Sequence, residues 1–168
     1  MLGDYYNRCE DQLDLHFQDG NYYTDWIADE LFVVVFTDYE HKVFSLAKQA
    51  IEFSESLIMA KKDFCRDNNV EIGIDIGISA GEAYIGMMGP RTHSKTTALG
   101  ETPGISRRIQ TIGKLLRHAL GESDRILASK GVVEKTGSFR EWEVFKHNRD
   151  FRDLNTDTVH HITLGTKS

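Results

Sequence analysis

The residue types that could contact a phosphorylated ligand gather between positions 72 and 110. Arg107 and Arg108 stand together there, and a guanidinium group can hold a phosphate through paired hydrogen bonds. The stretch is rich in glycine, but no Gly-Lys-Ser/Thr sequence follows its glycines, so it is not a phosphate loop of the P-loop NTPase type. Arg108 fits a solvated helix face equally well, so its role depends on the elements that position it.

Those elements can be predicted from periodicity. Residues 72–79 alternate isoleucine with glycine, aspartate and serine, which is typical of a strand with one apolar face. The glycines thin the other face, where a helix or a ligand can approach closely. The turn at 80–82 is expected to lead the chain back into a second strand at 83–89. A helix is expected to begin at Thr102, a hydroxyl cap followed by proline, and to end at Gly121.

The remaining patterns complete an alternation of helices and strands. Helices are expected at 4–19 and 40–67. Further strands are expected at 21–27, 31–36, 124–129, 140–145 and 158–164. The first two of these form a hairpin with the polar tip Ala28-Asp29-Glu30. This order predicts an α+β fold with a ferredoxin-like core, in which helices cover one face of a mostly antiparallel sheet.

Length and composition narrow the class of protein. The 168 residues, 40% hydrophobic and 27% charged, predict a single domain over 1–168 with an ordinary core. The net charge of −6 argues against a nucleic-acid binder. Cys9 and Cys65 are too few for a disulfide framework, which favours a reduced, cytoplasmic protein. No apolar run in the sequence is long enough to span a membrane.

Three segments carry a resemblance to a known family: IADELFVVVF (27–36), IGIDIGISAGEAYIGMMG (72–89) and TALGETPGISRRI (97–109). In this order and spacing they resemble the catalytic domain of class III nucleotidyl cyclases, the adenylate and guanylate cyclases. The resemblance implies the cyclase form of the ferredoxin-like core. It also implies conversion of ATP or GTP to a cyclic monophosphate with the help of two Mg²⁺ or Mn²⁺ ions.

The resemblance gives roles to three residues in strands and turns. Asp29 matches the second metal-binding aspartate of the family, whose tip sequence is Gly-Asp, and a polar turn residue is the ordinary alternative. Asp25 stands where the family usually has a lysine that contacts the purine, and a carboxylate cannot donate to a purine acceptor. Thr97 matches the threonine variant of a second purine contact, or it is simply a strand former.

Two positions on the helix after Thr102 match the groups with which the family stabilises its transition state. The arginine position is Arg108, and the asparagine position one turn earlier is Gly104, which has no side chain to donate. The family places a further metal-binding aspartate on a first strand before the helix at 4–19, where this chain shows no apolar run. We therefore expect a cyclase domain over 1–168 that lacks this strand. The strands beside the gap should have open edges, unless strand exchange, an unusual dimer or a late strand such as 158–164 repairs the sheet.

These departures favour a degenerate cyclase domain that is regulatory or dimerising and has lost its activity. Family sites form between two head-to-tail domains, so we expect a homodimer or a heterodimer with another cyclase-type domain, with ATP or GTP as candidate ligands. The alternative is a functional adenylate or guanylate cyclase subunit that upstream sequence or a partner completes. That subunit would need Mg²⁺ or Mn²⁺, and the degenerate domain would not. A third interpretation is an unrelated ferredoxin-like binding module.

Overall fold

Helices and strands alternate along the chain in the computed structural model, which describes residues 2–18, 22–120, 124–145 and 159–163. The helices are α1 (Leu2–His16), α2 (Val43–Asn68), α3 (Glu101–Leu120) and α4 (Lys130–Thr136), with 3-10 turns η1 (Glu40–Lys42) and η2 (Gly137–Phe139). The strands are β1 (Tyr22–Ile27), β2 (Glu30–Val35), β3 (Asp75–Ile78), β4 (Tyr84–Met88), β5 (Lys95–Leu99), β6 (Arg125–Ser129), β7 (Glu143–Phe145) and β8 (Val159–Thr163).

The described strands form three separate sheets. One has the order β3-β6-β8-β7, and β1-β2 and β4-β5 are two-stranded. The β3-β6 pair is parallel, and the other pairs are antiparallel. β2 pairs only with β1 and β3 only with β6 among these strands, so the expected open edges are present on both. The predicted α+β class with mostly antiparallel strands is confirmed.

The long helix α2 forms because its apolar residues recur at helical spacing. Ile51, Ile58 and Phe64 are almost completely buried. The helix expected at 40–67 is η1 followed by α2. It ends where Asn69 takes the left-handed conformation, with φ at 52°, a common way to terminate a helix.

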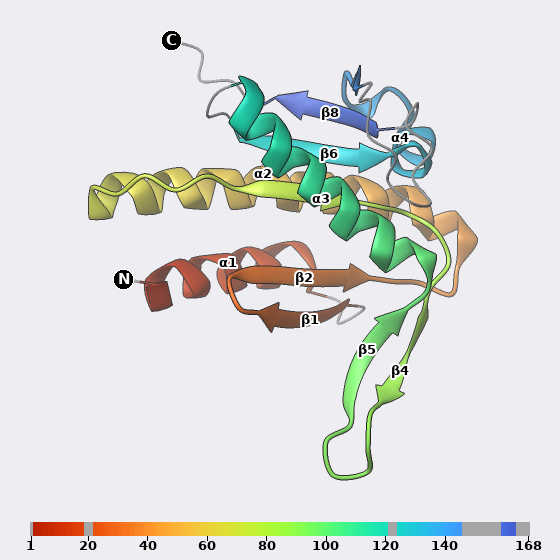
Figure 1. Cartoon of the computed structure of the whole chain (residues 1–168). Coiled ribbons are helices and arrows are strands. Elements are labelled where there is room, and N and C mark those ends of the chain that lie inside the picture. The colour runs from red at the N-terminus through yellow and green to blue at the C-terminus, as the bar shows by residue number, and fades with distance from the viewer. Residues whose placement is uncertain (1, 19–21, 121–123, 146–158, 164–168) are drawn as a thin grey trace.

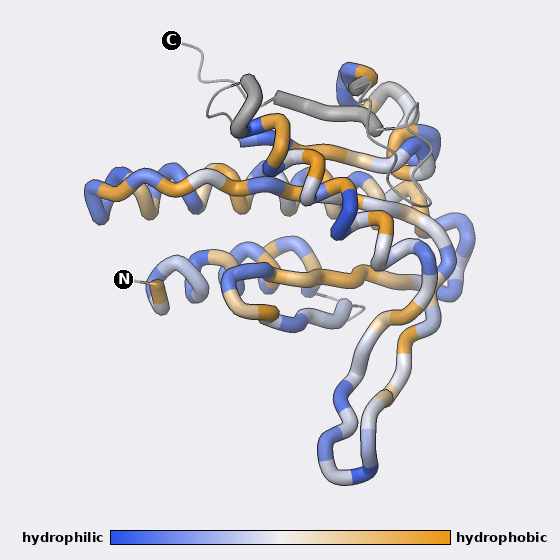
Figure 2. The backbone as a smooth tube through the Cα atoms, in the orientation of Figure 1, coloured by the Kyte–Doolittle hydropathy of each residue, from blue (hydrophilic) through white to orange (hydrophobic). Residues whose placement is uncertain are grey.

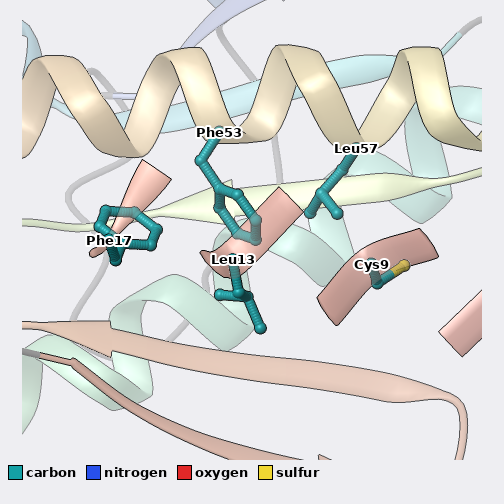
Figure 3. Packing of buried hydrophobic residues seen from close by; sticks show 5 residues of the cluster. All are labelled: Cys9, Leu13, Phe17, Phe53 and Leu57. Carbon is teal, nitrogen blue, oxygen red and sulfur yellow. The ribbon is translucent and has the colours of Figure 1, made fainter. Parts of the chain in front are cut away.

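One apolar cluster joins α1 and α2 to the strands. Figure 3 shows Cys9 and Leu13 of α1, and Phe17 just after its end, beside Phe53 and Leu57 of α2. Side chains from one face of β1, β2 and β3, and Ile74 just before β3, pack on this cluster; those on the strands include Tyr22, Leu31, Val33, Val35 and Ile76. The helices α1 and α2 therefore cover the same face of these strands, as the alternating sequence predicted.

The opposite face of β3 is covered by α3. A Cβ at Gly77 would lie 2.3 Å from the carbonyl oxygen of Ser106 and 2.6 Å from the backbone nitrogen of Gln110. Ile109 and Leu127 pack together on this side, and Leu127 is the register partner of Gly77. The sequence allowed either a helix or a ligand to approach the glycine face of β3, and the structure places the helix α3 there. Helices therefore cover both faces of β3, whereas the sequence analysis expected helices on one face of the sheet only.

The predicted hairpin of 72–79 with 83–89 is wrong. β4 pairs with β5 instead, and the two form a hairpin that extends past β1 and β2 (Figure 1). The physical reason lies at the turn: the Ser79 hydroxyl donates to the carbonyl of Thr102 (2.7 Å), and the Thr102 hydroxyl donates to the carbonyl of Glu82 (2.8 Å). These bonds tie residues 79–82 to the start of α3, which directs the chain away from β3.

The late strand at 158–164 does not repair the gap beside β3. It forms β8, which pairs with β6 and β7 on the far side of β6, because β3 already occupies the other edge of β6. The expected strand at 140–145 is shorter, since β7 begins at Glu143. The expected helix end at Gly121 lies outside the described residues. None of the described helices combines the length and apolarity of a membrane span.

Candidate functional site

Asp29 lies at the tip of the β1–β2 hairpin and lines a groove between β2 and β3. The register partners Ile27 and Glu30 leave Ala28 and Asp29 as a two-residue turn, in which Ala28 takes a positive φ of 57°. The turn leaves Asp29 exposed. The carboxylate is therefore accessible, as a metal ligand or as a polar turn residue would be.

A metal ion at Asp29 would need further ligands from the residues around it. Mg²⁺ needs several oxygen ligands in near-octahedral geometry. In the described residues, no group of three or more histidine, cysteine, aspartate and glutamate side chains could hold an ion. The neighbouring Glu30 lies near Arg107, with Oε2 and Nε 3.9 Å apart. Asp29 is therefore the one described carboxylate to which the resemblance gives a metal-binding role.

The two adjacent arginines of α3 point to different surroundings. Arg107 is exposed, lines the groove and approaches Glu30 beside the hairpin tip. Arg108 is half-buried and is not among the groove-lining residues of the described chain. The structure therefore brings Arg107 toward Asp29, whereas the sequence singled out Arg108. Adjacent residues on a helix are about 100° apart around its axis, so the side chains of Arg107 and Arg108 point in different directions.

Asp25 forms an ion pair with Lys95, which joins β1 to β5. The ammonium donates a hydrogen bond that lowers the pKa of Asp25 from its ordinary value, and Asp25 raises the pKa of Lys95 in return. Thr97 follows two residues after Lys95 on the same strand face and is half-buried opposite Gly86. Lys95, which pairs with Asp25, therefore shares a strand face with Thr97, and the resemblance makes both Asp25 and Thr97 purine-contact positions.

Gly104 stands in the first turn of α3 with open space around it. No atom lies within 4 Å of a Cβ built at this position, leaving out its chain neighbours and the helix's own backbone. Packing therefore does not require glycine here. The position that the resemblance gives to an asparagine has room for a side chain but carries none.

Sequence reasoning missed two partners in this region. Lys95 is 70 residues from Asp25, and no local pattern connects them. Arg117 of α3 forms a 2.8 Å ion pair with Asp75 of β3, whose side chain is only 4% exposed. The glycine at 73 offered a signal for the second partner, because a Cβ there would lie 1.9 Å from Arg117 Nη1. Sequence alone showed that something approaches Gly73 but not which residue.

Among the comparisons with known proteins, only the comparison with solved structures found matches. No protein-family model matches the chain, and no curated protein matches its sequence. The guanylyl cyclase Cya2 aligns with a TM-score of 0.66 at 16% identity, over 98% of this chain and 78% of that one. A bacterial light-regulated adenylyl cyclase aligns with a TM-score of 0.67 at 16% identity, over 94% and 73% of the two chains.

A third solved cyclase structure also aligns with this chain. The adenylyl cyclase CyaB from P. aeruginosa aligns with a TM-score of 0.69 at 13% identity, over 99% of this chain and 81% of that one. Identities this low show the fold and not the activity. The fold that the three sequence segments predicted is confirmed: this chain has the fold of the class III adenylyl and guanylyl cyclase catalytic domains.

Proposed function

We propose that this chain is a degenerate nucleotidyl cyclase domain, which acts in signalling through dimerisation or regulation and does not turn over ATP or GTP. One observation carries the proposal. Gly104, in the position of the transition-state asparagine, has no side chain to donate, and apart from its chain neighbours and its own helix backbone no described atom lies within 4 Å of where its Cβ would be. Loss of one such donor costs about 10²–10³ in rate.

The metal side of the site supports the same proposal. Asp29 is a single exposed carboxylate, and the described residues offer no group of three ligands around it. A metal ion assists phosphoryl chemistry only where several protein oxygens fix its geometry. A defect in charge neutralisation and a missing donor together would leave negligible turnover.

The same proposal extends to the partners of the chain. It acts as one cytoplasmic unit that pairs with itself or with another cyclase-type domain, head to tail, and a homodimer repeats both defects at its two sites. Arg108, at the position that the resemblance gives to the transition-state arginine, would hold a nucleotide phosphate across such an interface. Thr97 would contact the purine base of that nucleotide.

A working adenylate or guanylate cyclase subunit, completed by upstream sequence or by a partner, is the alternative, and Lys95 favours it. Its ammonium sits on Asp25, so a hydrogen-bond donor is present where the resemblance expects a lysine. In this alternative Lys95 contacts the purine, Asp29 binds Mg²⁺ or Mn²⁺, and the second domain supplies the missing carboxylate and asparagine.

The test is turnover by the purified chain with Mn²⁺ and ATP or GTP, with cyclic nucleotide measured by mass spectrometry. We expect no product above a sample without protein, and a known cyclase assayed in parallel shows that the conditions support turnover. We expect the variant Gly104→Asn to remain inactive as well, since it restores the donor but not the metal ligands. Clear turnover by the native chain alone would contradict the proposal.

Binding is tested separately from turnover. Titration calorimetry with ATP and GTP, with and without Mn²⁺, distinguishes a nucleotide-sensing domain from one retained for dimerisation alone. If nucleotide binds, Lys95→Met should weaken the binding of the preferred nucleotide. Arg66→Met, which removes a charge from the exposed end of α2, should leave this affinity unchanged.

A further inference from the structure

The hairpin of β4 and β5 carries an exposed aromatic ring on one of its two faces. Gly86 is the register partner of Thr97, and Tyr84 lies two residues before Gly86 on β4. Register partners share a face and alternate residues return to it, so Tyr84, Thr97 and Lys95 lie on the same face. Figure 2 shows the far end of the hairpin hydrophilic, with hydrophobic residues nearer the rest of the chain. Tyr84 begins β4 at this nearer end and is 68% exposed.

The missing side chain of Gly86 makes room for the Tyr84 ring. A Cβ built at Gly86 would lie 3.1 Å from Cε1 of Tyr84, and 3.6 Å from both its Cζ and its hydroxyl oxygen. The outer end of the ring therefore lies over the backbone of Gly86, next to Thr97 across the strand pair. A side chain at position 86 would push the ring away from this place. One part of the ring rests on the hairpin, and the exposed remainder is open to a flat ligand.

The polar groups on the same face suit the edge of a purine base. Lys95 lies two residues before Thr97, and its ammonium donates a hydrogen bond to the carboxylate of Asp25. The pair presents N–H donors and carboxylate acceptors side by side, and the Thr97 hydroxyl can act as either. A purine likewise carries N–H donors and nitrogen or carbonyl acceptors next to one another along its edge. An aromatic ring together with such polar groups is the usual way in which proteins hold an unpaired base.

We propose that Tyr84 stacks on the purine base of a bound nucleotide. Thr97 and the Asp25–Lys95 pair then lie along the edge of that base. Every base has a π face, so stacking on Tyr84 strengthens the binding of both purines and leaves the choice between them to the polar edge. The inference rests on the part of the proposed function that makes ATP and GTP candidate ligands, and it requires no turnover. The resemblance gives roles to Asp25 and Thr97 but none to Tyr84.

The test is calorimetric titration with ATP and with GTP in the presence of Mn²⁺, repeated with tripolyphosphate, which has neither base nor ribose. We expect Tyr84→Leu to weaken the binding of both nucleotides by about tenfold, the size of one base–aromatic stack, and to leave any affinity for tripolyphosphate unchanged. Tyr84→Phe keeps the ring and should retain most of the affinity. The control Tyr39→Leu removes a tyrosine of similar exposure, 59%, outside the hairpin and should bind as the native chain does.

A tryptophan at the same position gives a direct signal of stacking. Tyr84→Trp should bind nucleotide at least as tightly as the native chain, and ATP or GTP should quench its fluorescence while tripolyphosphate should not. The native chain, with Trp26 and Trp142, supplies the background. Gly86→Ala should weaken nucleotide binding in the native chain, because the new methyl group displaces the ring. The same substitution should have no further effect in Tyr84→Leu, where no ring remains to be displaced.

Several outcomes would overturn the inference. They are a native chain that binds neither nucleotide, a Tyr84→Leu chain that binds both at native strength, an equal loss in Tyr39→Leu, and an equal loss of tripolyphosphate affinity in Tyr84→Leu. A loss of self-association in Tyr84→Leu, measured by analytical ultracentrifugation, would also overturn it, since a second chain would then cover the ring. None of these results produces cyclic nucleotide. The proposed loss of turnover is contradicted only by product in the Mn²⁺ assay, so the two failures are distinguishable.

Discussion

At the residue scale, the pair Asp25–Lys95 shows how one charge reversal is compensated. Asp25 has the wrong sign for the lysine position that the resemblance gives it, but it holds Lys95 beside it. The ammonium on β5 thus stands where the resemblance expects one on β1. A carboxylate and a lysine that are distant in sequence together restore a cationic group at this place on the surface.

Removing Lys95 should raise the pKa of Asp25 toward its ordinary value of 3.8, because the Lys95 hydrogen bond is the main cause of its lowering. The variant is Lys95→Met, and the measurement is a carboxyl-carbon NMR titration of Asp25. Because the pKa of Asp25 is lowered in the folded chain, the pair stabilises the fold at pH values above the pKa of Asp25 in the unfolded chain. Because the pKa of Lys95 is raised, the pair also stabilises the fold at pH values below the ordinary lysine pKa of 10.5. The stability advantage of the native chain should therefore vanish in acid and at strongly alkaline pH. The pKa of Asp67, which a hydrogen bond from Arg8 lowers, should not change and serves as the control.

Gly104 and Gly77 form a matched pair for substitution by alanine. Gly104→Ala should stabilise the chain by about 0.5–1 kcal/mol, because alanine favours the helix over glycine and nothing obstructs the methyl group. Gly77→Ala should destabilise it by about 1–3 kcal/mol, since the new methyl group would meet the backbone of α3. Urea unfolding followed by circular dichroism gives both values. Equal effects in the two variants would show that α3 does not pack on Gly77 as described.

At the element scale, α3 is held by contacts that begin and end on β3. Ser79 and Thr102 join its first turn to the end of β3, and Asp75 and Arg117 join its later turns to the beginning of β3. A helix fixed at two places presents its remaining side chains in a defined direction. This is why Arg107 and Lys114 both line the groove.

Removing the Arg117 end of this connection should be costly. Arg117→Met removes the ion pair of Arg117 with the Asp75 carboxylate, which is 4% exposed, and we expect a loss of up to about 3 kcal/mol in the free energy of unfolding. The double variant Asp75→Asn/Arg117→Met removes the buried charge and should recover part of that loss. Thermal denaturation of the three chains measures it, and a double variant that is less stable than Arg117→Met would rule out the buried charge as the cause.

At the scale of the whole molecule, the sheets differ in how well they are supported. β6 lies between β3 and β8, and its first four residues are buried. β4 and β5 pair only with each other among the described strands, and Tyr84, Met87 and Leu99 on them are exposed. Stability is therefore distributed unevenly, with the most protected strand beside α2 and α3 and the least protected in the extended hairpin.

Hydrogen–deuterium exchange should reproduce this order. Backbone amides of β6 should exchange most slowly, since they open only when the core unfolds, and those of β4 and β5 should exchange fastest among the strands. Peptide-resolved mass spectrometry at several times gives the ranking. Protection of β4–β5 equal to that of β6 would indicate that another chain covers the hairpin in solution, and dilution would then release it.

The sequence by itself determined most of the helices and strands, though not α4, and with them the cyclase-like fold and several residues of the candidate site. Alternating isoleucines set the apolar face of β3, the glycines between them marked where α3 could approach, and Asp29 was placed correctly at a hairpin tip. These features follow from local periodicity and turn chemistry, which act over a few residues. Gly104 likewise needed no structure, because a missing side chain is visible in the sequence.

Only the tertiary structure decided which residues meet. It joined Lys95 to Asp25 across 70 residues, turned Arg107 rather than Arg108 to the groove, and paired β4 with β5. It also placed β8 beyond β6 and left the edges of β2 and β3 facing one groove. The physical reason is that such contacts depend on how helices and sheets pack together, and strand edges and ion pairs distant along the chain leave no periodic trace in the sequence.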